Sequence, residues 1–193
     1  MARLEINVKM NLSEDHEQLI KEFLLQWWLG LQQELARTTT RISLPSLHPN
    51  DLYEQELGKK LQQIALAAEG QLERSRETAE EVSTAIFDLL EMLWSRPGCS
   101  ELVDPPLSFW AGQFGYMVLQ ADLWASDDQL ITMREAAALL GVSLQSLRGS
   151  INFGVLSEYK DIHEANPRRA TRLRLNEVKQ LAEGRKSSGD HYV

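Results

Sequence analysis

The chain has 193 residues and a formal net charge of −8, and its composition, 43% hydrophobic and 25% charged, is that of an ordinary globular protein. This length allows one or two domains with a buried core. The sequence contains no run of about 18 apolar residues and no signal-peptide core, so we expect neither a membrane span nor a secreted protein. The single cysteine, Cys99, excludes an internal disulfide and predicts a cytoplasmic protein.

The charge is unevenly distributed along the chain. Residues 1–126 contain 10 Lys or Arg and 19 Asp or Glu, whereas residues 129–188 contain 10 Lys or Arg and 6 Asp or Glu. This asymmetry indicates a basic module that faces nucleic acid, attached to an acidic region. We therefore divide the chain into an acidic helical scaffold and dimerisation domain (1–126), a basic module (127–188) and a flexible tail (189–193).

The first 44 residues predict a strand, a helix and a second strand. Apolar and polar residues alternate over residues 4–10, as in a half-buried strand. Ser13 is an N-cap candidate for an amphipathic helix that extends to about Arg37. The β-branched segment TTTRISL (38–44) is a second candidate strand, so that the scaffold would carry a short strand pair.

Apolar residues between Leu57 and Leu93 recur every three or four positions, with Ser75 as a polar interruption. Two arrangements fit this pattern. In one, two antiparallel helices break near Gly70; in the other, a single helix of about 65 Å pairs with a second copy of the chain. Together with the apolar face at Trp27 and Trp28, this seam predicts a homodimer that forms through the N-terminal region.

Prolines and glycine in residues 96–106 end this helical region. Ser108 is then an N-cap candidate for a helix over residues 108–125, which is apolar around most of its circumference. Such a helix needs burial on several sides, and we expect it to pack between the scaffold and the basic module. Asp127 and Asp128 mark its end.

The basic module opens with ITMREAAALLGVSLQSLRGSINFGVL (131–156), which predicts two short helices joined by a turn. Thr132 and Glu135 match a capping box at the start of the first helix, and Gly141 suits the positive φ at its end. Ser143 is the expected cap of the second helix, and Gly154 its expected end. Leu147 and Ile151 form its buried face. Two short helices with a turn that contains glycine make a helix-turn-helix.

The stretch TMREAAALLGVSLQSLRGSINFGVLS (132–157) resembles the winged helix-turn-helix of the MerR/excisionase superfamily. The motif of that superfamily begins with a polar cap and an EAA-type helix. It continues with LGVS, a second helix, and a glycine followed by two apolar residues. The segment NPRRATRLRLNEVKQLAEGRK (166–186) is similar to the basic hairpin wing and closing helix of these proteins. The resemblance implies a DNA-binding fold for the basic module alone; because the module is C-terminal here, no effector domain is carried over.

The second helix of the motif is the expected recognition helix. Gln145 and Arg148 can make bidentate hydrogen bonds to adenine and guanine edges, and Ser143 can offer its hydroxyl and backbone N–H to a phosphate. The expected DNA-binding residues are Ser143, Gln145, Ser146, Arg148 and Asn152 in this helix, and Arg168, Arg169, Arg172 and Arg174 in the wing. The alternative for the wing is a basic hairpin that pairs with the protein's own acidic half.

These features predict a mainly α protein that binds double-stranded DNA as a transcriptional regulator or DNA-architecture factor and is not an enzyme. The four histidines lack metal-ligand spacing, Cys99 lacks a cysteine partner for zinc, and GxxxxGK[ST] and GxSxG motifs are absent from the sequence. We therefore expect neither a metal nor a cofactor. The alternative function is a protein–protein adaptor whose winged helix binds another polypeptide.

Overall fold

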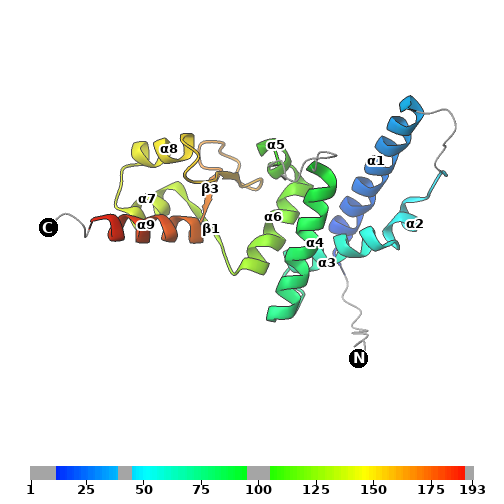
Figure 1. Cartoon of the computed structure of the whole chain (residues 1–193), viewed down its shortest axis with the longest axis horizontal. Helices are drawn as coiled ribbons and strands as arrows, with labels where there is room; N and C mark the ends of the chain where they lie inside the picture. Colours follow the sequence, from blue (N-terminus) through cyan, green and yellow to red (C-terminus); the bar gives the residue numbers. More distant parts are fainter. Residues whose placement is uncertain (1–11, 39–44, 95–104, 190–193) are drawn as a thin grey trace.

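The computed structural model describes residues 12–38, 45–94 and 105–189 (Figure 1). These residues are mainly helical and contain one small antiparallel sheet of three strands, which confirms the predicted fold class of a mainly α protein. The strand predicted at 4–10 lies outside the described residues. So does the strand predicted at 38–44, apart from Thr38, which ends a helix instead.

In the first part of the structure, the N-terminal unit, the described residues form helices and no strands. Their bounds are α1 (Glu14–Thr38), α2 (Pro49–Tyr53), α3 (Glu56–Ala68), α4 (Arg76–Trp94), α5 (Leu107–Trp110) and α6 (Gln113–Ser126). The helix predicted after Ser13 is confirmed as α1, and the Ser13 hydroxyl accepts the backbone N–H of His16 at 3.3 Å. Three acidic residues in the first turn of α1 favour this helix start because they complement the helix dipole.

Residues 56–94 form two helices, so the single long helix is wrong and the break near Gly70 is confirmed. Gly70 has a φ of +67°, a left-handed conformation that ends α3 and that other residues adopt at a cost. Ser75, the polar interruption of the apolar seam, caps α4 together with Thr78. The backbone N–H of each bonds the hydroxyl of the other, at 2.9 and 3.1 Å.

Glu69, the residue that follows α3, joins the end of that helix to the start of α1. Its carboxylate accepts the backbone N–H of Ser13 at 3.2 Å and contacts the Ser13 hydroxyl and the Nδ1 atom of His16. Burial raises the pKa of Glu69, but these hydrogen bonds outweigh it and hold the pKa below its usual value. The carboxylate is therefore charged at neutral pH and fastens α1 to α3.

The helix α6 lies at the centre of the N-terminal unit, packed against α3, α4 and α1. Its buried residues are Gly115, Met117, Val118, Leu119, Ala121, Leu123 and Ala125. The single helix predicted over residues 108–125 with Ser108 as its cap is wrong. The short α5 starts directly after Pro106, and the chain turns before α6 begins. Gly115 permits this turn, because a β-carbon there would lie 2.0 Å from the carbonyl oxygen of Phe109.

The second part, the C-terminal unit, combines three strands with three helices within the described residues. Its elements are β1 (Leu130–Thr132), α7 (Met133–Leu140), α8 (Leu144–Asn152), β2 (Tyr159–Lys160), β3 (Thr171–Arg174) and α9 (Leu175–Gly189). The strand order is β1-β3-β2, and Ile131 pairs with Leu173 in the register of β1 and β3. A separate buried cluster holds these elements together: Ile131, Ala136, Ala137, Leu147, Leu156, Leu173 and Val178.

The predicted helix boundaries of the basic module are confirmed. Thr132 and Glu135 form a capping box at the start of α7, and Gly141 ends that helix with a φ of +63°. The Ser143 hydroxyl accepts the N–H of Ser146 at 3.1 Å and caps α8, and Gly154 follows that helix with a φ of +70°. These caps fix where α7 and α8 begin, and residues near both helix starts line the candidate site described below.

The two units meet at a short connection after α6. Asp127 has a φ of 55° and ends α6. One carboxylate oxygen of Asp128 accepts the backbone N–H groups of Gln129 at 2.8 Å and of Asn176 at 3.0 Å, so the connection is tied to the start of α9. In Figure 1 the C-terminal unit stands beside α6, on the side away from α1 and α2.

Candidate nucleic-acid interface

The helix α8 presents the predicted recognition residues to solvent. Ser143, Gln145, Ser146, Arg148 and Asn152 are all exposed, while Leu147 is fully buried and anchors the opposite face of the helix. Gln145, Arg148 and Asn152 are three and four residues apart, so they share one face of the helix. The Ser143 oxygen is occupied by the cap, which leaves its hydroxyl hydrogen available to a ligand.

The loop 161–170 connects β2 to β3 and carries two of the predicted arginines at its tip. The residues Asn166-Pro167-Arg168-Arg169 form a β-turn: the N–H of Arg169 donates to the Asn166 carbonyl at 2.8 Å. The Asn166 side chain accepts the N–H of Arg168 at 3.0 Å. Asparagine at the first position and proline at the second favour such a turn. Arg168 and Arg169 are both exposed as a result.

A hollow of about 490 Å³ lies between this loop and the N-terminal ends of α7 and α8. Five arginines line it, and we call it the arginine groove: Arg134, Arg148, Arg168, Arg169 and Arg172. Among the described residues that line it, Glu164 is the single acid. The fold thus gathers positive charge from two helices and one loop around one concave surface, a setting that suits an anionic ligand.

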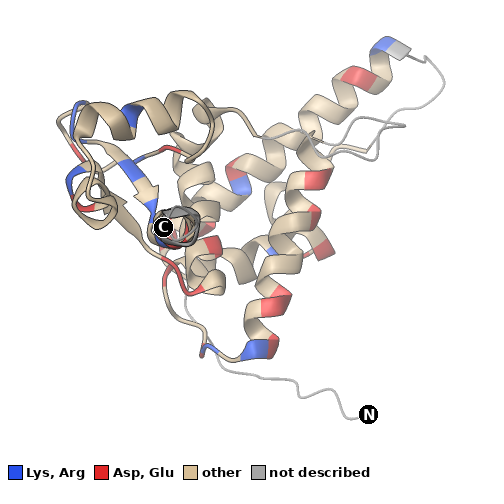
Figure 2. Cartoon of the chain, turned by 60° about the vertical axis from the view of Figure 1, so that its left-hand side comes forward, with Lys and Arg blue, Asp and Glu red and all other residues tan. Residues whose placement is uncertain are grey.

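The charge distribution over the two units differs. Figure 2 shows Lys and Arg on α8, on β3 and along the neighbouring loop of the C-terminal unit. The charged residues on the exposed face of α4 in the N-terminal unit are mostly acidic: Glu77, Glu80, Glu81 and Glu91. The basic surface predicted from the sequence is therefore concentrated on the side that contains the arginine groove.

Arg172 lines the arginine groove with its charge already paired. Its guanidinium donates to Asp161 at 2.8 Å and also bonds the backbone carbonyl of Arg169. The side chain of Arg172 is 15% exposed. Arg172 therefore serves the structure of the loop, and the other four arginines of the groove carry the charge that is open to a ligand.

Arg174, the last residue of β3, does not line the arginine groove and contacts α6 instead. Its guanidinium pairs with Asp122 of α6 and lies 5.5 Å from the centre of the Tyr159 ring. Burial lowers the pKa of Arg174, but the neighbouring Asp122 carboxylate outweighs it and raises the pKa above the ordinary value. Its buried Nε atom finds no hydrogen-bond partner among the described residues. Arg174 therefore follows the alternative given for the wing: it pairs with the acidic half of the chain, at Asp122.

Arg134 is the groove residue that the sequence prediction omitted. It is the second residue of α7, it is exposed, and it lines the groove together with Arg148. A signal was present, since the capping box at Thr132 fixes the start of α7, and helix N-termini attract anions. The sequence alone did not show that α7 and α8 direct their N-terminal ends to the same hollow.

Comparisons with protein-family models, with curated proteins and with solved structures found no match. Within residues 12–38, 45–94 and 105–189, no group of three or more His, Cys, Asp or Glu side chains is placed to hold a metal ion. No helix of the same residues is long and apolar enough to cross a membrane.

Proposed function

We propose that the protein binds double-stranded DNA through its C-terminal unit, as a cytoplasmic transcriptional regulator or DNA-architecture factor. The observation that carries the proposal is the arginine groove, where exposed guanidinium groups from α7, α8 and the loop 161–170 surround one hollow. Arginine forms bidentate bonds with phosphates and with guanine edges, and the major groove of B-DNA admits an α-helix. In this proposal the unit acts as a winged helix-turn-helix, with α8 as its recognition helix.

The exposed residues then divide into two classes. Arg148, with Gln145 and Asn152 on the same face of α8, meets base edges in the major groove. Arg168 and Arg169 at the loop tip, and Arg134 in the first turn of α7, meet phosphates of the backbone. This division reduces the predicted wing contacts from four arginines to two and adds Arg134.

The binding of DNA is expected to weaken steeply as salt rises. Each phosphate that an arginine neutralises contributes about −0.9 to the slope of log K against log salt concentration. With Arg134, Arg168 and Arg169 on phosphates, we expect a slope of about −3 for each C-terminal unit that binds a fluorescently labelled duplex of random sequence. Fluorescence anisotropy over a series of KCl concentrations measures it, and a slope near zero would contradict the proposal.

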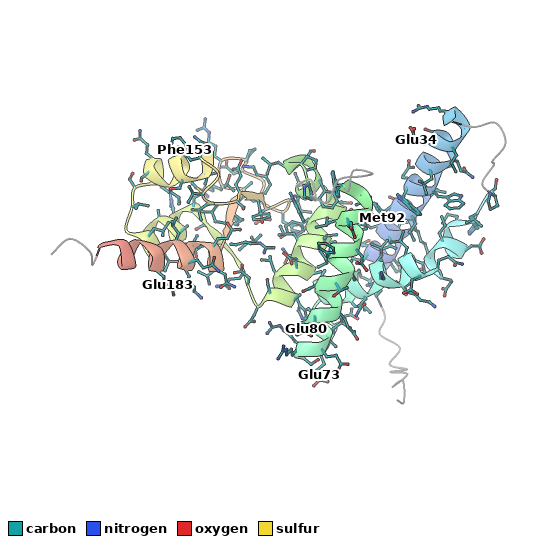
Figure 3. The ribbon with its side chains drawn as sticks, in the orientation of Figure 1. Glu34, Glu73, Glu80, Met92, Phe153 and Glu183 are labelled. Atoms are coloured by element: carbon teal, nitrogen blue, oxygen red, sulfur yellow. The ribbon has the colours of Figure 1, made fainter. Side chains whose placement is uncertain are left out.

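An adaptor function is the second candidate, and the exposed apolar side chains after α8 favour it. Phe153 is 86% exposed and Val155 is 55% exposed, and Figure 3 shows Phe153 projecting from the end of α8. Exposed apolar side chains that lie close together are typical of protein contacts. The same salt series separates the two functions, because an adaptor neutralises no phosphates.

The DNA-binding proposal includes a homodimer, since one module of this size contacts only a short half-site. The apolar seam between Leu57 and Leu93 is mostly buried in the core of the N-terminal unit. The exposed apolar side chains that remain for a dimer contact are Leu29 and Leu31 on α1 and, separately, Phe87 and Met92 on α4. Light scattering is expected to give twice the chain mass of 22.0 kDa, and a monomer at micromolar concentration would rule the dimer out.

A further inference from the structure

Asp161, at the start of the loop 161–170, joins the two ends of that loop. One carboxylate oxygen accepts a hydrogen bond from the Arg172 guanidinium at 2.8 Å, and the other accepts one from the backbone N–H of His163 at 3.0 Å. The backbone N–H of Asp161 donates to the carbonyl of Ala170 at 2.8 Å, which closes the loop at its base. The Asp161 side chain is 22% exposed, so these bonds are largely shielded from water.

Asp161 is linked through Arg172 to the arginines at the tip of the loop. Arg172, held by Asp161, also donates to the carbonyl of Arg169. On the other side, the His163 ring lies 5.4 Å from the ring of Tyr116 on α6, in an edge-on contact. The loop is thus fixed between β3 and the N-terminal unit, and its remaining segment, with Arg168 and Arg169, faces the arginine groove.

We propose that Asp161 is the positioning residue of the DNA interface, which holds Arg168 and Arg169 where phosphates pass without itself touching DNA. This inference rests on the proposed function and extends it to the residue that sets the affinity of the loop. The positioning role is testable because it predicts the opposite change in DNA affinity from the one that the Asp161 charge alone would cause. A carboxylate near a polyanion is repulsive, so its removal would tighten binding if only its charge mattered. Loss of positioning weakens binding instead, because the freed loop must be ordered when DNA binds.

The test is Asp161→Asn in the full chain, with its affinity for the random-sequence duplex measured by fluorescence anisotropy. We expect binding about five-fold weaker than that of the wild type, and a smaller salt slope, because Arg168 and Arg169 are no longer held at phosphates. Glu183→Gln is the matched control, since it removes the same charge from exposed α9, away from the loop (Figure 3). The control is expected to bind as tightly as the wild type or slightly more tightly.

A double-mutant cycle separates positioning from general damage to the fold. When Arg168→Ala and Arg169→Ala are already present, Asp161→Asn is expected to cause no further loss. A loss of the same factor in both backgrounds, or tighter binding of Asp161→Asn itself, would overturn the positioning role while the proposed function stands. A wild-type chain that binds no DNA would overturn the proposed function, and this inference with it.

Discussion

Replacing Arg148 with alanine is expected to weaken binding to the preferred DNA sequence by about 1–3 kcal/mol, roughly five- to 150-fold, and to blur the preference at one base position. Arg148 is exposed on α8 and lines the arginine groove, on the helix face that contains Gln145. A bidentate arginine–guanine contact discriminates between bases, so its loss affects the preferred sequence more than others. The measurement is anisotropy on duplexes selected by the wild type from a randomised pool, compared with single-base variants.

Arg168→Ala is the matched control for Arg148→Ala, because both remove one exposed arginine from the same groove. A phosphate contact carries no sequence information, so this control is expected to weaken all duplexes alike and to flatten the salt slope by about one unit. Gln145→Ala is expected to resemble Arg148→Ala with a smaller effect. Equal effects of both arginine changes, insensitive to salt, would favour the adaptor.

Replacing Asp122 with alanine is expected to lower the free energy of unfolding by about 2–3 kcal/mol, because it leaves the charge of Arg174 unpaired between the two units. The side chain of Arg174 is 18% exposed and that of Asp122 is 33% exposed, so the effect lies below that of a fully buried pair. Adding Arg174→Met is expected to restore most of the loss, since an apolar chain can pack against Tyr159. Urea denaturation followed by circular dichroism measures each variant.

The pair between Asp88 and Lys60 provides the comparison for Asp122→Ala. It joins α3 and α4 at 2.6 Å, but its side chains are 40% and 35% exposed, so water screens it. Asp88→Ala is expected to cost less than about 1 kcal/mol. If Asp122→Ala costs no more than Asp88→Ala, the contact between α6 and β3 contributes little to holding the units together.

The sequence by itself determined the features whose causes lie within a few residues. The caps at Thr132 and Ser143, and the glycines at Gly141 and Gly154, are where the pattern placed them. Each depends on a hydrogen bond or a backbone angle that residues within the same turn provide. Ser143, Gln145 and Arg148 are exposed for a similar reason, since the helix period and Leu147 fix the face of α8.

The course of the chain between residues 56 and 126 needed the tertiary structure. The apolar period was compatible with one helix or two, because Gly70 lowers helix stability without forbidding a helix. Packing of α3 and α4 against α6 favours the bend, since it buries the seam within one chain. The predicted helix start at Ser108 failed because the turn before α6 depends on contact between Gly115 and the backbone of Phe109.

The hairpin arginines show the limit of sequence reasoning most directly. Four arginines within residues 168–174 are chemically equivalent in the sequence, and all four were expected to contact DNA. The fold separates them: Arg174 finds its carboxylate partner 52 residues away on α6, and Arg172 finds Asp161 across the loop. Arg168 and Arg169 remain exposed at the turn. Which arginine stays open to a ligand depends on which carboxylates the fold brings within bonding distance, and only the three-dimensional packing decides that.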